Sequence, residues 1–135
     1  MAQSRFRRTP LLMRAIALLL LALANTPAPA TRLVIQRTTL AGFTHHAAAA
    51  LWPELQEGDA LQLEHESGNP HDAQAVRVLW RGNMLGYLPR TDNGALARAL
   101  HQGLLLDARI SHLREHPDPR RRIEVEISAS PARPD

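Results

Sequence analysis

The residues with the greatest chemical capacity lie in two short segments, His45-His46 and the loop Asn69-Pro70-His71-Asp72. Their imidazole and carboxylate groups could bind a transition metal, but they show neither a helical i, i+4 pair nor a known ligand spacing, so a metal site is the weaker alternative. The same groups could be drawn as His/Asp hydrolytic machinery. However, the sequence has no serine in an elbow motif, no paired catalytic carboxylates and no phosphate-cradling loop. We therefore expect a non-catalytic protein without a metal or cofactor.

Asn69 and Asp72 allow a structural interpretation as well as a ligand-binding one. In a turn, such side chains accept hydrogen bonds from nearby backbone amides and fix the connection between two strands. The same loop can also present them to a ligand, because binding residues concentrate on loops. Both interpretations stay open at this point, and His71 between them is expected to be exposed.

Arginines flank the next expected hairpin. Arg77, Arg81 and Arg90 could form a phosphate-binding strip, since strand alternation places Arg77 and Arg81 on one face. An ordinary solvated sheet face would show the same pattern. The run Arg120-Arg121-Arg122 could likewise meet phosphate or an anionic surface, but such loop clusters are more often simply solvated.

The distribution of charge removes one argument for a nucleic-acid partner. The chain has 135 residues, a formal net charge of +3 and no cysteine, and all 16 basic residues are arginine. Residues 31–135 hold twelve arginines against thirteen acidic residues, a formal net charge of −1. Bulk charge therefore does not point to nucleic acid. The absence of cysteine excludes disulfides, thiolate catalysis and cysteine zinc sites.

Residues 1–30 have the three parts of a secretory signal peptide. Arg5 to Arg14 form a positive region, Ala15–Ala24 is an unbroken apolar run of ten, and Ala28-Pro29-Ala30 offers the small-x-small cleavage pattern. Ten apolar residues are too few to span a bilayer of about 30 Å, which needs roughly twenty. We expect a periplasmic or secreted protein with no stable membrane anchor after processing. The alternative is an amphipathic or buried N-terminal helix.

The alternation of apolar and polar residues, together with the turn signals between them, predicts a small β-rich domain that would carry His45-His46 and the Asn69–Asp72 loop. The sequence predicts strands near residues 31–37, 61–64, 76–80, 84–88, 104–110 and 123–127, a short helix within 47–55 and a second helix ending at His101. The prediction is a mainly β fold, a closed or nearly closed barrel of five or six strands with one or two short helices. The barrel domain would occupy residues 31–129, and 130–135 would be a disordered tail.

Several local expectations refine this fold. Gly82-Asn83 should form the tight hairpin turn, and Thr91, Asp92 and Asn93 are successive candidate N-caps of the second helix, which Gly103 should end. Glu124 and Glu126 should point out from their strand. The side chains expected in the core include Val76, Val78, Trp80, Leu96 and Leu100.

Two blocks of the sequence resemble the HIRAN domain. They are L-x-L-x-x-E-x-x-N-P-H-D-x-x-A-V-x-V, from Leu61 to Val78, and L-G-Y-L-P-R, from Leu85 to Arg90. Gly42-Phe43 and the helix before Gly103 also fit, so the resemblance covers about residues 40–128. It implies a modified OB-like β-barrel.

The resemblance also implies a ligand, the 3′ end of single-stranded DNA. Carried over position by position, the base-stacking places fall on His45 and His71, the hydroxyl-binding places on Asn69 and Asp72, and a phosphate-binding place on Arg90. Thr44 stands where the family has a basic residue, which removes one potential phosphate contact. Imidazole is also a smaller stacking platform than phenol, so this chain should bind single-stranded DNA more weakly than the nuclear members of the family do.

Two other functions remain open. The leader favours an exported interaction module that binds a peptide, an envelope component or another non-nucleic-acid ligand. A third possibility is an accessory domain for a zinc-dependent or ATP-hydrolysing partner, because larger family members carry such modules. The sequence names no protein partner.

Overall fold

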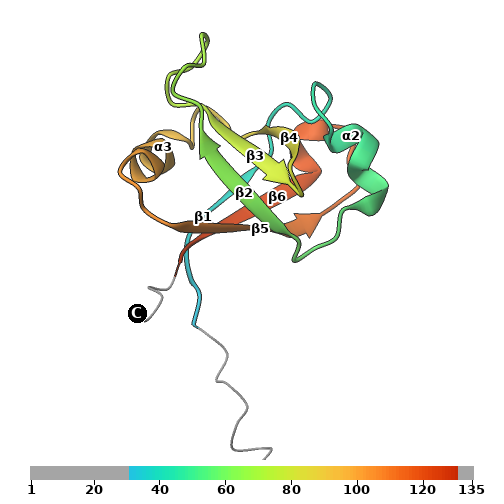
Figure 1. Cartoon of the computed structure of the whole chain (residues 1–135). Coiled ribbons are helices and arrows are strands. Elements are labelled where there is room, and N and C mark those ends of the chain that lie inside the picture. Colours follow the sequence, from blue (N-terminus) through green and yellow to red (C-terminus); the bar gives the residue numbers. More distant parts are fainter. Residues whose placement is uncertain (1–30, 131–135) are drawn as a thin grey trace, which may run out of the picture. The chain divides into compact units, whose positions relative to one another are not determined.

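Six antiparallel strands form one sheet in the computed structural model, which describes residues 31–130 (Figure 1). The strands are β1 (Leu33–Thr39), β2 (Ala60–His65), β3 (Val76–Trp80), β4 (Asn83–Tyr87), β5 (Leu106–Leu113) and β6 (Ile123–Ala129). Their order across the sheet is β1-β6-β5-β2-β3-β4. The predicted mainly β fold is confirmed.

Short helices connect the strands. They are α2 (Ala48–Leu51), the 3-10 helix η1 (Trp52–Glu54), α3 (Gly94–His101) and the 3-10 helix η2 (Pro119–Arg121). Helix α2 gives way to η1 at Pro53, which has no backbone N–H for a continued α-helix. Helices α3 and α2 lie at opposite ends of the domain, at the left and the right of Figure 1.

The sheet closes into a barrel at one residue pair. Ala41, just after β1, donates its backbone N–H to the carbonyl of Tyr87 at 2.8 Å, and the Tyr87 N–H donates to the carbonyl of Ala41 at 2.9 Å. Gly86 permits this approach, because a β-carbon there would overlap the carbonyl oxygen of Ala41. The predicted barrel is therefore closed at a narrow seam between β1 and β4.

The core is built from the faces that the alternation predicts. Val76, Val78 and Trp80 are buried, and the Trp80 indole Nε1 donates to the Asp59 carboxylate at 2.9 Å. From α3, Leu96 is buried and Leu100 packs against the core from a partly exposed position. The full set of buried apolar side chains in the main cluster is Leu40, Phe43, Ala48, Leu55, Leu61, Val76, Val78, Trp80, Leu85, Leu88, Leu96, Ala97, Ala108, Ile110, Ile123, Val125 and Ile127.

Of three local predictions, one is confirmed, one is confirmed in part and one is wrong. Gly103 does end α3, with φ of 78° and its N–H bonded to the carbonyl of Leu100. Asn93 stands at the N-cap position, but its side chain makes no cap hydrogen bond. Its Nδ2 donates instead to the carboxylate of Asp72 at 2.8 Å. The hairpin turn is Arg81-Gly82 rather than Gly82-Asn83, since both residues have the positive φ (47° and 79°) of the primed turn that suits a two-residue connection.

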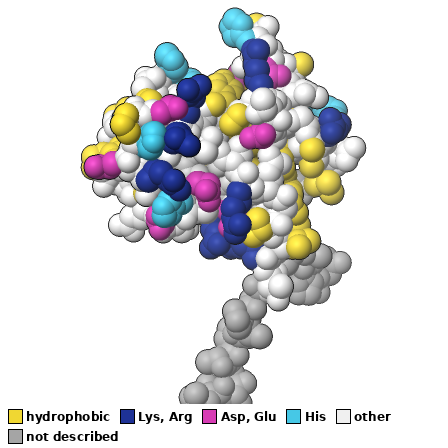
Figure 2. Space-filling view, turned by 180° about the vertical axis from the view of Figure 1, so that it is seen from behind, with side chains coloured by type: hydrophobic (Ala, Val, Ile, Leu, Met, Phe, Trp, Pro, Cys, Tyr) yellow, Lys and Arg dark blue, Asp and Glu magenta, His cyan; other side chains and the backbone are white. Residues whose placement is uncertain are grey.

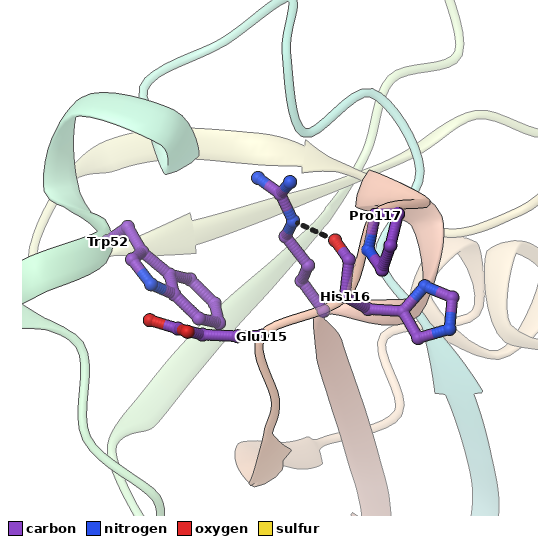
Figure 3. A pocket seen from close by; sticks show the side chains of 5 residues that line it. Trp52, Glu115, His116 and Pro117 are labelled. Atoms are coloured by element: carbon purple, nitrogen blue, oxygen red, sulfur yellow. Dashed lines mark hydrogen bonds between the residues drawn. The ribbon is translucent and has the colours of Figure 1, made fainter.

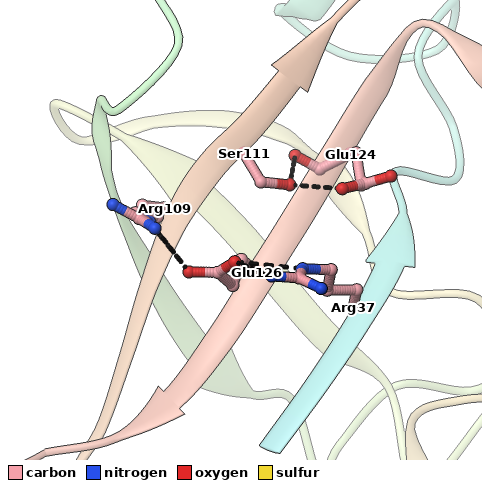
Figure 4. A network of polar contacts seen from close by, with 5 residues as sticks. All are labelled: Arg37, Arg109, Ser111, Glu124 and Glu126. Atoms are coloured by element: carbon pink, nitrogen blue, oxygen red, sulfur yellow. Dashed lines mark hydrogen bonds and ion pairs between the residues drawn. The ribbon is translucent and has the colours of Figure 1, made fainter. Parts of the chain in front are cut away.

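Glu126 corrects another expectation. It points away from the core, as predicted, yet its side chain is only 3% exposed. Arg37 of β1 and Arg109 of β5 hold its carboxylate from the two neighbouring strands at 2.9 and 2.7 Å (Figure 4). Glu124 is partly exposed and accepts a hydrogen bond from Ser111 at 2.7 Å.

The surface of the described residues is uneven in composition. Figure 2 shows arginine, histidine and acidic side chains interspersed over the left part of this face, while apolar side chains are most numerous toward its lower right. The large apolar side chains that are exposed are Leu33, Val34, Ile35, Leu104 and Leu105. Leu104 was expected to continue an alternating strand, but β5 begins only at Leu106.

The leader prediction for residues 1–30, and all of the predicted tail except Ser130, lie outside the described residues. Ser130 itself donates its backbone N–H to Leu105 at 3.2 Å. Within residues 31–130, no helix combines the length and apolar character that a membrane span requires.

Candidate functional site

A cavity of about 300 Å³ lies between the β2–β3 connection and the end of β4. We call it the loop cavity. Its lining residues are Ala41, Asn69, His71, Asp72, Ala75, Tyr87, Leu88 and Arg90. The structure therefore brings together four of the predicted site residues, Asn69, His71, Asp72 and Arg90, whereas His45, Arg77 and Arg81 are not part of this lining.

Asn69 shapes the loop through its side-chain oxygen. Oδ1 accepts backbone hydrogen bonds from His71 at 2.8 Å and from Asp72 at 3.1 Å, which is an Asx turn. The side-chain amide also lies beside the Tyr87 hydroxyl, and its hydrogen bonding there opposes the rise in the pKa of Tyr87. Nδ2 has two N–H groups, so it can still donate to a ligand at the cavity. The structural interpretation of Asn69 is thus supported without excluding the ligand-binding one.

Asp72 joins the loop to the helix that follows β4. Its Oδ1 accepts the backbone N–H of Gln74 at 2.9 Å, and its Oδ2 accepts from Nδ2 of the buried Asn93 at 2.8 Å. These two hydrogen bonds, in that order of importance, and the nearby Arg90 hold the pKa of Asp72 below its ordinary value of 3.8. An ionised carboxylate has about four acceptor positions, so this one can accept further hydrogen bonds from a ligand.

Arg90 braces the loop from the opposite wall. Its Nη2 donates to the carbonyl of His71 at 2.6 Å, and its Nε lies 4.0 Å from Oδ2 of Asp72. The side chain is still 69% exposed, which leaves part of the guanidinium open to solvent. The His71 imidazole is exposed, as expected, and makes no hydrogen bond within the described chain.

Tyr87 is an aromatic wall that the sequence reasoning did not assign to the site. Its hydroxyl donates to Glu66 at 2.7 Å, and this hydrogen bond together with burial raises the pKa of Tyr87 above its usual value of 10. The His46 ring lies edge-on to it, with ring centres 5.5 Å apart and planes at 68°. His45 is exposed and is not part of the lining. His46 is the one of the two whose ring contacts a lining residue, Tyr87. The position of Tyr87 within L-G-Y-L-P-R, on the face opposite the buried Leu88, was the signal that could have identified it.

The predicted arginine strip does not form. Arg77 lies opposite Tyr87 in the β3–β4 register, and its Nη1 is 3.5 Å from the Glu64 carboxylate. Arg81 lies in the hairpin turn at the other end of β3, where its guanidinium covers the Trp80 ring at 4.5 Å. Strand alternation failed here because Arg81 belongs to the turn rather than to the strand.

The weak metal alternative has no geometric support. Among residues 31–130, the structure gathers no group of three or more histidine, aspartate and glutamate side chains that could hold an ion. His71 and Asp72 line the cavity without His45 or His46.

Comparisons with known proteins agree with this architecture. The family model of the HIRAN domain matches residues 33–131. No curated protein sequence matches the chain. A solved structure of a protein from Lactobacillus plantarum has a TM-score of 0.63 at 25% sequence identity, covering 73% of this chain and 95% of that one.

The second solved structure is the HIRAN domain of human HLTF, with a TM-score of 0.58 at 16% identity. The match covers 73% of this chain and 78% of that one. At this identity the likeness is one of fold. The family model spans most of the chain and includes both sequence blocks and every residue of the loop cavity. The chain therefore belongs to the HIRAN domain family.

Proposed function

We propose that this domain is a non-catalytic nucleic-acid-binding module, and that the loop cavity receives the 3′-terminal nucleotide of single-stranded DNA. HIRAN domains are in general nucleic-acid-binding modules, and the chain belongs to that family. The observation that carries the proposal is the convergence of Asn69, His71, Asp72 and Arg90 on one cavity of about 300 Å³.

The groups in the cavity match the parts of a terminal nucleotide. The Asp72 carboxylate can accept a hydrogen bond from a 3′-hydroxyl, and the Nδ2 of Asn69 can donate to the same oxygen. The exposed part of Arg90 can donate to the adjoining phosphate. Tyr87 and His71 supply ring surfaces against which the sugar or base can pack.

Asp72 should also discriminate between two kinds of end. A 3′-phosphate would bring negative charge to a carboxylate that its hydrogen bonds keep ionised. Two unit charges 4 Å apart repel by about 1 kcal/mol even in bulk water, which corresponds to roughly fivefold in affinity. We expect the hydroxyl end to bind at least that much more tightly.

The test is fluorescence anisotropy with short oligonucleotides that end in a 3′-hydroxyl or a 3′-phosphate. The wild type should prefer the hydroxyl, and Asp72→Asn should lose the preference because the substitution removes the charge with nearly the same shape. The variant also loses one of the two hydrogen bonds that Asp72 accepts, so a thermal melt must show that it is still folded. Asp107→Asn makes the same change of charge on β5 and should keep the preference. Equal binding of both ends by the wild type would reject the model, and no binding at low salt would exclude nucleic acid as the ligand.

Variants of two neighbouring histidines test which of them stacks on a base. The resemblance implies His45, whereas His46 lies against Tyr87. His46→Ala should weaken oligonucleotide binding, because His46 packs against Tyr87 at the rim of the cavity. His45→Ala should leave binding unchanged. The reverse result would restore His45 as the stacking residue.

A further inference from the structure

A second cavity, of about 410 Å³, lies between η1 and the β5–β6 connection. We call it the tryptophan cavity, and its lining residues are Trp52, Glu115, His116, Pro117 and Arg122 (Figure 3). None of them lines the loop cavity. Its volume lies within the range of about 300–1,000 Å³ that is usual for small-ligand sites.

Trp52 provides a fixed aromatic surface. Its indole is partly exposed, and the buried Phe43 packs edge-on against it with ring centres 5.7 Å apart. The Arg122 guanidinium lies 5.0 Å from the centre of the Phe43 ring, and its Nε donates to the carbonyl of His116 at 2.8 Å. Its Nη1 and Nη2 donate no hydrogen bond to any other described residue, so two nitrogens with two N–H groups each are held in place and left open to a ligand.

The other polar groups of the cavity are also open. Glu115 is exposed and makes no hydrogen bond or ion pair with the described residues. Nδ1 of His116 accepts the backbone N–H of Asp118 at 3.0 Å, so in the neutral imidazole Nε2 carries the proton. Figure 3 shows Glu115 beside Trp52, with His116 and Pro117 on the other side of the cavity.

This combination selects the chemical class of the ligand. A phosphate could bind Arg122 but would be repelled by the Glu115 carboxylate and would leave it without a donor. An aliphatic group would leave the open donors and acceptors unpaired. A planar base satisfies both parts of the site, since its face can stack on Trp52 while its edge makes hydrogen bonds.

Among the bases, guanine has the matching edge. A carboxylate can accept from its N1–H and from its exocyclic N2 amine, and a guanidinium can donate to its O6 and N7. Adenine, cytosine and thymine do not offer two adjacent donors together with two such acceptors. We propose that the tryptophan cavity is a base-binding subsite that prefers guanine.

The two cavities flank one segment of the chain. Ala41 lines the loop cavity, and two residues later Phe43 packs against Trp52 and Arg122. A strand that ends in the loop cavity would pass this segment, so the tryptophan cavity would hold a base upstream of the 3′ end. This part of the inference rests on the proposed function.

The experiment is an anisotropy titration of thymidine oligonucleotides in which one guanine is moved stepwise away from the 3′ end. At one position guanine should tighten binding about tenfold, because a matched pair of hydrogen bonds discriminates between bases on that scale. Glu115→Gln should remove the guanine effect, so that this variant binds guanine-containing and all-thymidine strands with equal affinity. Glu54→Gln removes the same charge from η1 without touching the cavity, and should behave as the wild type.

A second measurement makes failure of the two proposals distinguishable. Titration with 5′-GMP should change the tryptophan fluorescence more than titration with 5′-AMP, and the difference should disappear in Trp52→Phe. If thymidine oligonucleotides bind but guanine has no effect in either assay, the tryptophan cavity proposal is overturned and the loop cavity proposal stands. If no oligonucleotide binds, the proposed function fails, and the GMP titration alone decides whether the cavity binds guanine.

Discussion

Gly86→Ala should destabilise the barrel by breaking the seam at which it closes. The new β-carbon would overlap the carbonyl oxygen of Ala41 and lie 3.2 Å from the Leu40 side chain. Ala41 must then move away from β4, which breaks its two backbone hydrogen bonds with Tyr87. Those bonds contribute about 0.5–1.5 kcal/mol each, and the steric displacement of a packed site costs about 1–3 kcal/mol more. The expected loss is about 2–6 kcal/mol, out of a total stability of roughly 5–15 kcal/mol.

Urea titration and thermal melting, both followed by circular dichroism, measure this loss. For a domain of this size, each 1 kcal/mol lowers Tm by about 4–8 °C, so the melt should fall by roughly 10 °C or more. Gly68→Ala is the matched control, because a β-carbon at Gly68 meets nothing within 4 Å and its φ is not positive. If the two variants have the same Tm, the seam does not contribute measurably to the stability of the domain.

Two further predictions concern acid stability and processing. Hydrogen bonds and charge from Arg37 and Arg109 hold the pKa of Glu126 below its usual 4.5, so its contribution to stability is present above pH 4.5 and is lost as the pH falls through the lowered value. Urea midpoints should therefore show Glu126→Gln less stable than the wild type at neutral pH, with the two converging in acid; a constant difference at every pH would contradict this. For the leader, intact-mass analysis after expression in a Gram-negative host should find a chain beginning at or near Thr31, and recovery of the full-length chain in the cytoplasm would disprove export.

The strands were predictable because burial imposes a period of two on the sequence. The alternation of Val76, Val78 and Trp80 can be recognised from the sequence of that strand alone, and all three side chains are buried. Glu126 has the same outward position in the pattern as an exposed residue. Its burial depends on Arg37, 89 positions away, and on Arg109, so no local pattern contains it.

The site was predictable where a loop motif fixes its own geometry. The side chains of Asn69 and Asp72 accept hydrogen bonds from backbone N–H groups two or three residues later in the chain. The conformation of the N-P-H-D loop is therefore determined by its own sequence. The segment around His45 and His46 has no comparable sequence pattern that indicates which ring faces Tyr87. The direction of this segment depends on the turn at Gly42, whose φ is 78°, and it brings His46 against Tyr87. At Asn93 a tertiary contact replaces a local one. The side chain is suited to cap helix α3, but it donates a hydrogen bond to Asp72 instead.

The pairing of β1 with β6 has a consequence for the order in which the chain becomes structured during synthesis. Leu33 pairs with Ala129 and Thr39 with Glu124, so the first strand of the domain finds its neighbour only when the last strand has been made. The β3–β4 hairpin can form as soon as its own residues emerge, whereas β1 must wait for most of the domain, and such distant pairings slow folding. Until β6 has been synthesised, β1 therefore lacks its partner strand and is in a state that a chaperone can still engage.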